Sequence, residues 1–589
     1  MLRRIVDYYT IVVPMKSTAE VDADQWILTL SFDGGATYYS LEGVRFHRWW
    51  LVLASCVAHL AAGSLPAFHS LQDPLDIYLD HAHATIERQS YLWLGISTAL
   101  VGPWIERHGP RTGMALGTLL VAVGYLVSHF AIRAASPTLV VFGLGGCSGA
   151  GFGFVLISST AAVLKWFPDL RGVVTGLGLS SFVLGHVGWS YVYKTTFHDM
   201  NNMPQLFWTT GGLFASIKAI ADWLTLSFVC SLGLALVPTL ALATLVMRSP
   251  PPTFVIHGLN MHGVAAADAP DATLVHVDFH QVGLTLVNDD VVAHMNDDGA
   301  RPMDKNQEYA TAQSLLQCLA STDFVIFSVA VVAGFVPAML LLSNAHVLAI
   351  VHLVTGKDPT METRSLLDTH HLVVMAAGSL LLPLLSDVCV CCATRPVLVR
   401  KIGFLILLVS QLVVVARLPT LLMADGLRWS FLVLVFCSGG ALALAPSFLT
   451  DLFGVFHVGT MYGLVLTAWA FGPVVVTSVA PTPASLQAQL ASMVVLLACG
   501  VVAIILVRTD AKDRFYRGYQ VTLCGNVVVQ CAACGSHPPL PRASVDKTRT
   551  DQDHLDVTIL DRPEHPASHF ALWQVRHDPT TGLSPSTTH

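Results

Sequence analysis

Long apolar stretches separated by short polar ones dominate this sequence. Twelve of them approach or reach the length of about 20 helical residues that a hydrocarbon core of about 30 Å requires. They lie at about 49–70, 90–105, 111–133, 138–164, 171–195, 223–247, 323–345, 369–388, 401–423, 428–450, 456–479 and 485–508. Because a spanning segment must satisfy its backbone polar groups internally, the pattern predicts an all-α polytopic membrane protein with twelve transmembrane helices.

Polar segments divide these stretches into two sets of six. The predicted organisation is a leader over 1–47, an N-terminal bundle over 48–247, an insert over 248–322, a C-terminal bundle over 323–508 and a tail over 509–589. We expect a mostly flexible insert, although TLVHVDFHQVGLTLVNDD alternates like a strand. The polar, proline-containing tail is expected to be mostly disordered. Residues 196–222 predict an amphipathic piece on the membrane surface.

An internal repeat indicates that the two bundles are homologous. The stretch from Lys165 to Gly185 returns from Asp451 to Gly472 at one constant offset. Its shared glycines are Gly172 and Gly459, Gly176 and Gly463, and Gly185 and Gly472. A second echo matches Ala62, Gly63, Pro66 and Ala67 with Ala333, Gly334, Pro337 and Ala338. Glycines four apart let a neighbouring backbone approach, and matching Pro and Gly in two halves indicate a central pathway. We therefore expect two pseudo-symmetric six-helix bundles.

Composition narrows the class of protein. With a mean hydropathy of +0.60, 53% hydrophobic and 12% charged residues, the chain is not an ordinary soluble protein. A formal net charge of −7 without a basic tract gives no indication of nucleic-acid binding. No Walker loop, zincin motif or nucleophile elbow occurs in the sequence. We expect neither enzymatic activity nor a cofactor or metal, and we expect a monomer in the lipid bilayer.

Charge at the ends of the stretches predicts that both termini are cytoplasmic. Basic residues flank the leader, insert and tail at Arg45, Arg48, Arg248, Arg508, Lys512, Arg514 and Arg517. The loops on the two sides hold similar numbers of basic residues, so these flanks decide the orientation. The sequence does not specify which membrane houses the protein. Cys389, Cys391 and Cys392 follow a predicted cytoplasmic helix end, where they are either acylated or free.

A charged motif after the second stretch carries a family resemblance. Its residues are Gly102, Glu106, Arg107, Gly109 and Arg111. They fit the loop signature G-x-x-x-[DE]-R-x-G-x-R and resemble the major facilitator superfamily. A worn second copy, GSLLLPLLSD, keeps Gly378 and Asp387 but has Ser379 where arginine is usual and Pro383 where glycine is usual. The resemblance implies a cytoplasmic gate built from both copies, Asp387 included.

The repeated stretches resemble one branch of that superfamily. KWFPDLRG at 165–172, APSFLTDLFG and VGTMYGLVLTAWAFGP at 445–473 are similar to the oxalate/formate antiporters and to the related nodulin-like and monocarboxylate carrier families. The resemblance implies alternating access to a small organic anion, by proton symport or exchange. Carriers of dicarboxylates in this branch use basic residues where this chain has Ser379 and Trp469. A monocarboxylate-like anion is therefore expected rather than oxalate.

Candidate solute-binding residues lie on the predicted helices. They are His59, Ser64, His186, Tyr193, Asn344, Ser379, Tyr462 and Trp469. His59 can titrate near neutral pH, or it can stay neutral and bonded between helices. Tyr462 and Trp469 are seven residues apart and share a helix face, either toward a solute or in ordinary packing. The sequence leaves these alternatives open. It also leaves open a non-transporting receptor or scaffold that retains the transporter fold.

Overall fold

The computed structural model describes most of both bundles and parts of the polar segments. The described residues are 8–9, 18–27, 29–32, 37–40, 43–68, 86–134, 136–207, 236–251, 254–260, 315–341, 370–392, 396–418, 424–455, 457–476, 483–509, 518–523 and 526–532. Asn344 and the alternating segment at 273–290 lie outside them. The described residues form helices, together with three short antiparallel hairpins.

The N-terminal half contains helices at the positions of the first six predicted stretches. They are α3 (Arg48–Ala62) with α4 (Ser64–Ala67), α6 (Ile86–His108), α7 (Pro110–Arg133), α8 (Pro137–Val140) continuing through the π-helix η2 (Val141–Cys147) into α9 (Ser148–Trp166), α10 (Arg171–Phe207), and Leu236–Val246. The C-terminal half contains α15 (Leu315–Ala320), α16 (Thr322–Leu341), α19 (His370–Cys391), α20 (Pro396–Arg417), α21 (Ala424–Phe453), α22 (Val458–Val476) and α23 (Pro483–Leu506).

Nine helices in the described part of the chain are long and apolar enough to cross a membrane. The other three predicted stretches are also helical. Leu236–Val246 and Val458–Gly472 are shorter apolar helices, and α6 carries charged residues in its first and last turns. The prediction of a helical, polytopic membrane protein is confirmed.

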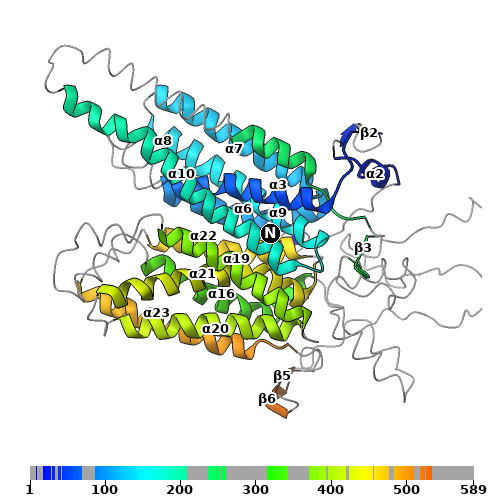
Figure 1. Cartoon of the computed structure of the whole chain (residues 1–589), viewed down its shortest axis with the longest axis vertical. Coiled ribbons are helices and arrows are strands. Elements are labelled where there is room, and N and C mark those ends of the chain that lie inside the picture. Colours follow the sequence, from blue (N-terminus) through cyan, green and yellow to red (C-terminus); the bar gives the residue numbers. More distant parts are fainter. Residues whose placement is uncertain are drawn as a thin grey trace, which may run out of the picture.

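The two halves lie side by side (Figure 1), the N-terminal half in blue through cyan to the green of Leu236–Val246, and the C-terminal half in yellow-green to orange. Across the boundary, α6 packs on α22 and α10 packs on α19. These are the second and eleventh, and the fifth and eighth, of the predicted stretches. The boundary therefore pairs the second helix of each half with the fifth helix of the other half.

The repeated glycines lie at those crossings. A Cβ atom on Gly176 would lie 2.8 Å from the carbonyl oxygen of Ser379 on α19. At the other crossing, a Cβ on Gly463 would meet the carbonyl oxygen of Thr98 on α6. The equivalence predicted from the repeat is thus confirmed in space, since each glycine of this pair allows close contact with the opposite half.

The third repeated pair joins helices within each half. Gly185 lies against Leu60 of α3, and Gly472 lies against Met339 and Phe335 of α16. The second echo is less regular, because Gly63 meets α10 whereas Gly334 faces Ala441 of α21.

The polar segments contain short regular elements. In the leader, α2 (Thr18–Ala23) precedes the hairpin of β1 (Thr29–Phe32) and β2 (Thr37–Ser40). The insert begins with the hairpin of β3 (Val255–Ile256) and β4 (Leu259–Asn260), and the tail contains that of β5 (Gly518–Leu523) and β6 (Asn526–Ala532). The structure differs from the amphipathic surface segment predicted at 196–222. Its first residues belong to α10, which continues without a break to Phe207.

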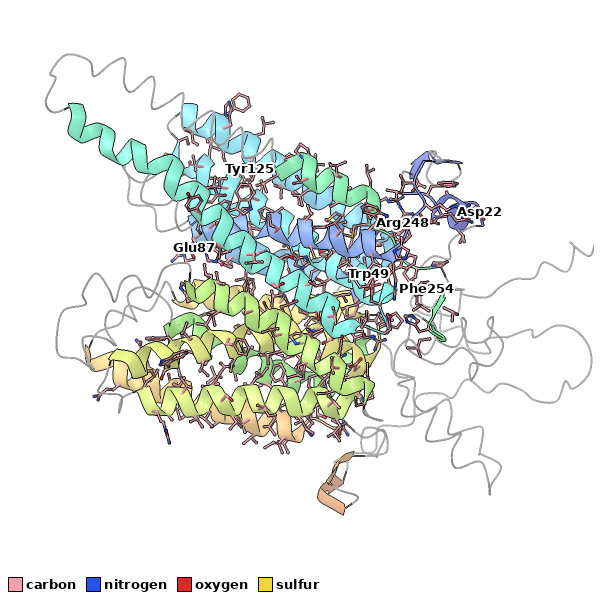
Figure 2. All side chains as sticks on the ribbon, viewed as in Figure 1. Asp22, Trp49, Glu87, Tyr125, Arg248 and Phe254 are labelled. Carbon is pink, nitrogen blue, oxygen red and sulfur yellow. The ribbon has the colours of Figure 1, made fainter. Side chains whose placement is uncertain are left out.

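Two arginines fasten the leader to the N-terminal half. Arg248 donates from Nη1 to the carbonyl oxygens of Asp24 and Trp26, at 2.6 and 2.9 Å, and its guanidinium lies 4.2 Å from the centre of the Phe46 ring. Arg111 donates to Thr29 O of the leader at 3.5 Å and to Met247 O at 3.2 Å. Figure 2 shows Arg248 at the same end of the molecule as Trp49, with Glu87 at the other end.

We predict that the crossing of α6 and α22 requires a glycine at 102. A Cβ there would lie 2.7 Å from the backbone nitrogen of Thr460, so Gly102→Ala should destabilise the protein by about 1–3 kcal/mol through overpacking. Thermal unfolding of the purified protein in detergent measures the effect. Gly188→Ala on α10 is the control, because nothing lies within 4 Å of its Cβ position. The control should be neutral or slightly stabilising, and equal losses in both variants would contradict the prediction.

Candidate functional site

A carboxylate at the end of α19 caps the helix that faces it from the other half. Asp387 accepts hydrogen bonds from the backbone nitrogens of Gly172 and Val173, at 3.0 and 2.7 Å. These N–H groups belong to the first turn of α10, where no intrahelical acceptor is available to them. The negative carboxylate also meets the positive end of the helix dipole. The contact is therefore both a hydrogen-bonded cap and an electrostatic attraction between the halves.

Glu106 occupies the equivalent position at the other crossing, although its Oε1 has no hydrogen-bond partner there among the described residues. It lies near the end of α6 and faces the backbone of Gly459, in the first turn of α22. The ammonium of Lys165, at the end of α9, pairs with the same carboxylate. Each half thus offers an acid from its second helix to the start of the fifth helix of the other half. Gly172 and Gly459 are the matched first glycines of the sequence repeat.

A chain of buried charges connects the Asp387 cap to a second cross-half ion pair. Arg171 Nη1 of α10 lies 2.7 Å from Asp451 Oδ1 of α21. Arg400 of α20 donates to Asp451 through Nε and to Asp387 Oδ1 at 2.8 Å through Nη2. Positive and negative groups alternate along this chain. We call Arg171, Asp387, Arg400 and Asp451 the ionic latch.

All four latch residues are buried. Taking charges out of water costs several kcal/mol per ion, so the arrangement is stable only while each charge keeps its partners. The contacts of Arg171 with Asp451 and of Asp387 with the start of α10 therefore hold the halves together at this end, and both are lost when the halves separate.

The predicted gating residues divide between two tasks. Glu106, Asp387 and Gly102 contact the opposite half. Arg107 instead donates to Tyr8 O in the leader, and its guanidinium lies 5.3 Å from the centre of the Tyr8 ring. Arg111 bonds the chain after the sixth predicted stretch. Gly109 has φ +84° and begins α7, a conformation that glycine adopts readily.

Four charged residues at this end were not predicted as gating groups. They are Lys165, Arg171, Arg400 and Asp451. Lys165, Arg171 and Asp451 entered the sequence analysis only within the repeated stretches, and Arg400 only among the basic residues of the loops. The available signal was the position of each charge within about one turn of a helix end and, for Arg171, its place directly before the repeated Gly172.

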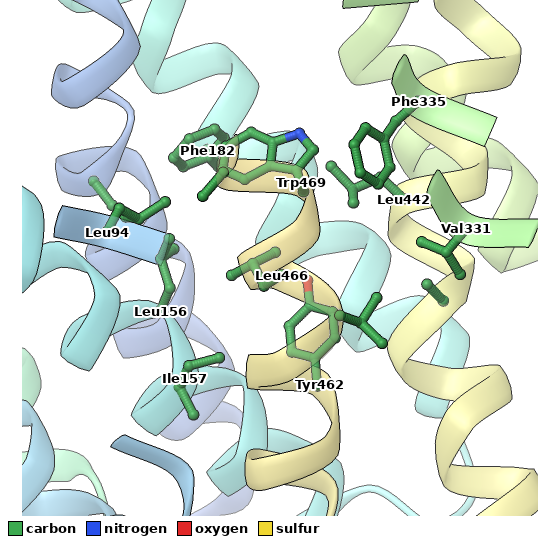
Figure 3. Packing of buried hydrophobic residues seen from close by; sticks show 14 of the residues in the cluster. Leu94, Leu156, Ile157, Phe182, Val331, Phe335, Leu442, Tyr462, Leu466 and Trp469 are labelled. Carbon is green, nitrogen blue, oxygen red and sulfur yellow. The ribbon is translucent and has the colours of Figure 1, made fainter. Parts of the chain in front are cut away.

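One face of α22 lies between the halves further along the boundary. Figure 3 shows Tyr462, Leu466 and Trp469 along this helix, with Phe182 of the N-terminal half on one side and Phe335 of the C-terminal half on the other. The expectation that Tyr462 and Trp469 share a face is met. Both side chains are buried.

Trp469 contacts aromatic rings of the N-terminal half. Its ring centre is 5.7 Å from that of Tyr91 at 73° and 6.0 Å from that of Phe182 at 75°. Edge-to-face pairs of this kind are worth about 0.5–1.5 kcal/mol each beyond the area they bury. Close by, Thr467 Oγ1 donates to Gly95 O at 3.1 Å and lies 3.3 Å from Thr98 Oγ1. Aromatic rings and hydroxyls, rather than charges, make these contacts.

His59 lies inside the N-terminal half. Its Nδ1 is 2.8 Å from Ser55 O, and its Nε2 is 3.4 Å from Thr160 Oγ1. A carbonyl oxygen only accepts, so Nδ1 carries the proton and Nε2 of the neutral ring accepts from the threonine. The ring also packs against α10, where a Cβ on Gly178 would lie 3.4 Å from it. The histidine thus joins α3, α9 and α10.

The remaining candidates lie in different places. Ser64 and Tyr193 face Tyr125 in a cluster of hydroxyls within the N-terminal half. The backbone of His186 packs against Gly63. Ser379 lies at the boundary of the halves, with Oγ donating to Ala376 O at 2.9 Å. The structure therefore brings Ser379, Tyr462 and Trp469 to the boundary and keeps His59, Ser64 and Tyr193 inside one half.

Two titratable groups in the turns between helices have shifted pKa values. Burial opposes ionisation of Asp169, but the Arg48 guanidinium, at 2.8 and 3.0 Å, outweighs it and holds the pKa of that carboxyl below its usual value. His457 precedes α22. Burial, together with the charge of Lys165, lowers the pKa of His457 to about 3.

Comparison with known proteins gives limited similarity. No family model matches this chain. Over 158 residues the chain is 26% identical to YhjX of Escherichia coli (strain K12), described as an uncharacterized MFS-type transporter. The match covers 25% of this chain and 36% of that protein, so the chain spans about a third of the relative's length.

Among solved structures, similar ones include three transporters. A bacterial homologue of the iron transporter ferroportin, in an outward-facing state, is 14% identical with a TM-score of 0.47, over 80% of this chain and 98% of that one. The E. coli fucose:proton symporter FucP is 14% identical with a TM-score of 0.44, over 79% and 99%. The proton:xylose symporter XylE is 14% identical with a TM-score of 0.47, over 78% and 94%. At these values they assign this chain neither a substrate nor a coupling ion.

We predict that Arg400 is the central group of the ionic latch. Arg400→Met leaves two buried aspartates short of a positive partner and should cost about 3–5 kcal/mol of unfolding free energy, measured by unfolding in detergent. Lys401→Met is the control, since this lysine caps carbonyl oxygens at the end of α23 and lies outside the latch. Adding Asp451→Asn to Arg400→Met should recover part of the loss. Similar effects of Arg400→Met and Lys401→Met would refute the latch.

We predict that His457 makes the fold sensitive to acid. Between the usual histidine pKa of about 6.5 and the folded value of about 3, the unfolded chain binds one proton more than the folded chain. Stability from this group is therefore present above about pH 6.5 and is lost as the pH falls, by up to about 1.4 kcal/mol per pH unit. Thermal unfolding at pH 7 and pH 5 should show a smaller acid loss in His457→Gln than in wild type. His108→Gln, at an exposed position, should behave as wild type, and identical losses in all three proteins would contradict the assignment.

Proposed function

We propose that this chain is a secondary transporter of the MFS type, in which a small organic solute crosses between two helix bundles that rock against each other. The observation that carries the proposal is the exchanged pair of acids at the two crossings: Asp387 caps the start of α10, and Glu106 lies against the start of α22. A receptor or scaffold needs no such reciprocity. A transporter does, because the same contact has to form and break in both halves.

The distribution of contacts along the boundary supports this motion. The latch closes one end with charged hydrogen bonds, whereas the face around Trp469 has aromatic and hydroxyl contacts. Glycines at both crossings let backbones approach without interlocking side chains. Opening the latch end then breaks a few strong contacts and leaves the helices of each half packed.

Chemistry at the boundary favours a solute with one negative charge or none. In the described part of the boundary, the arginines Arg171 and Arg400 are engaged by Asp451 and Asp387. Tyr462 and Trp469 offer stacking surfaces and one phenolic hydroxyl. A dicarboxylate would need a second buried cation. We therefore propose a monocarboxylate-like anion, and among such anions those with an apolar or aromatic body.

Coupling to protons or to a counter-substrate completes the proposal. His59 has Nε2 directed at Thr160 and its ring against Gly178 of α10. This helix packs on α19 of the other half. Protonation would turn Nε2 from an acceptor into a donor and so change its contact with Thr160. Proton symport through His59 is the proposed drive, with exchange as the other form of coupling.

The worn second motif does not argue for a receptor. Although Ser379 and Pro383 replace the usual residues, Asp387 still binds two backbone N–H groups of α10. Gly172 packs against the carbonyl of Pro383. The acid of the second copy therefore still binds the start of the helix that it faces in the other half.

We predict saturable uptake of a monocarboxylate by proteoliposomes containing the full chain, with Trp469 as an affinity determinant. Losing about 1.4 kcal/mol of aromatic contact in Trp469→Leu should raise the half-saturating concentration about tenfold. The assay is initial uptake of labelled aliphatic and aromatic monocarboxylates, with dicarboxylates as competitors. Trp429→Leu is the control, because Trp429 is 68% exposed on α21.

The same vesicles separate the parts of the proposal. An imposed pH gradient should accelerate uptake by wild type and not by His59→Gln, while uptake insensitive to both the gradient and a preloaded counter-substrate refutes coupled transport. No uptake of any solute refutes the transporter. Equal effects of the two tryptophan substitutions refute the role of the aromatic face alone.

A further inference from the structure

Three exposed cysteines lie within four positions at the end of α19. Cys389 and Cys391 belong to its last turn, Cys392 follows directly, and all three side chains are exposed. Neither the latch nor the boundary between the halves uses them. Their exposure and clustering distinguish them from Cys318 and Cys437, which are buried in the C-terminal half.

The cysteines continue a stripe of α19 that faces away from the protein. Leu381, Leu385 and Val388 are 50%, 59% and 55% exposed. Together with Cys392 they follow the spacing i, i+4, i+7 and i+11, which places them on one helix face. An exposed apolar stripe on a membrane-spanning helix contacts lipid tails. The thiols therefore lie where this lipid-facing stripe reaches the end of the helix.

The other face of the same turn belongs to the ionic latch. Ser386 and Asp387 are buried, and both bond Arg400. One turn of α19 thus has an acid that holds the halves together and thiols that face the lipid boundary. A group attached to the thiols would act on the helix end that carries Asp387.

Charge at this end of the bundle indicates that it faces the cytoplasm. The loops of the two ends hold similar numbers of basic residues, so the residues that flank the bundles decide the orientation. The described flanking residues Arg45, Arg48, Arg248 and Arg508 all lie at the latch end. An excess of basic residues marks the cytoplasmic side. Figure 2 shows Arg248 and Trp49 at this end.

We propose that Cys389, Cys391 and Cys392 form an S-acylation site that carries long-chain fatty acyl groups from acyl-coenzyme A. The thiol sulfur attacks the thioester carbonyl carbon and a new carbon–sulfur bond forms. The bond to the coenzyme A sulfur breaks, and coenzyme A leaves as a thiol with the proton of the cysteine. No oxidant or reductant is needed. Juxtamembrane cysteines on the cytoplasmic side are the usual acceptors of this modification.

Depth in the membrane separates this cluster from another exposed cysteine. Cys499 is exposed on α23 but precedes the end of that helix, Leu506, by seven residues, which is about 10 Å at the helical rise. Cys389 precedes the end of α19 by two residues, or about 3 Å. Acyl-coenzyme A, whose head group stays in water, reaches Cys389 at its shallow depth and does not reach Cys499.

The bound chains would insert alongside Leu385 and Val388 and anchor the end of α19 at the membrane surface. Since that end carries Asp387, acylation would restrain the movement of the latch acid relative to the bilayer. The modification itself does not depend on the transport proposal, because it requires only the exposed thiols and the orientation of this end.

The test is acyl-PEG exchange on the full chain expressed in eukaryotic cells. Free thiols are blocked, hydroxylamine cleaves thioesters, and each released thiol gains one PEG step on a gel. We expect one to three hydroxylamine-dependent steps in wild type. Cys389→Ser/Cys391→Ser/Cys392→Ser should reduce the shifted fraction at least tenfold, and each single substitution should lower it.

Matched variants make the outcome decisive. The wild-type pattern should remain in Cys499→Ser and in the tail variant Cys524→Ser/Cys531→Ser/Cys534→Ser. This result would place the acyl groups at the end of α19. The single substitutions serve where the triple variant is not recovered from the membrane. Absence of any hydroxylamine-dependent step in wild type overturns the proposal. Steps that persist in the triple variant, or that vanish in either matched control, also overturn it.

Discussion

A carboxylate buried between two helix bundles must find positive partners, because an unpaired charge in that environment costs several kcal/mol. Asp387 and Asp451 meet this constraint through Arg400 within their own half and through α10 and Arg171 of the other. The satisfaction of these acids therefore depends on the two halves being in contact. This dependence makes the latch end a natural point of control over their relative position.

The contacts along the rest of the boundary are weaker and can be exchanged. Repeated glycines set the helix separation at both crossings, so contact there comes from backbone proximity rather than from interlocked side chains. Beyond them Trp469 meets Tyr91 and Phe182 edge to face. Such contacts can be exchanged for contacts with an apolar solute at little cost. Strong contacts at one end and exchangeable ones further along are the physical basis of the proposed rocking.

The leader adds rigidity to one half only. Arg248, directly after the sixth predicted stretch, and Arg111 of α7 donate to carbonyl oxygens of the leader, and Arg107 binds Tyr8. Asp169 joins Arg48 at the start of α3 to His257 at the start of the insert. These contacts lie within the N-terminal half and its attached segments. The ionic latch, by contrast, connects the two halves.

The sequence by itself determined the helices, the duplication and the close crossings. Apolar length and glycine spacing are local properties of the chain, so Gly176 and Gly463, or Tyr462 and Trp469, could be placed on their faces without knowing a neighbour. Only the tertiary structure decided which charges meet. Arg171 and Asp451 are 280 residues apart, and Arg107 and Arg111 turn to the leader although the motif places them beside Glu106. The physical reason is that helix periodicity depends on residues within a few positions of one another. An ion pair depends instead on which helix ends the tertiary fold brings together.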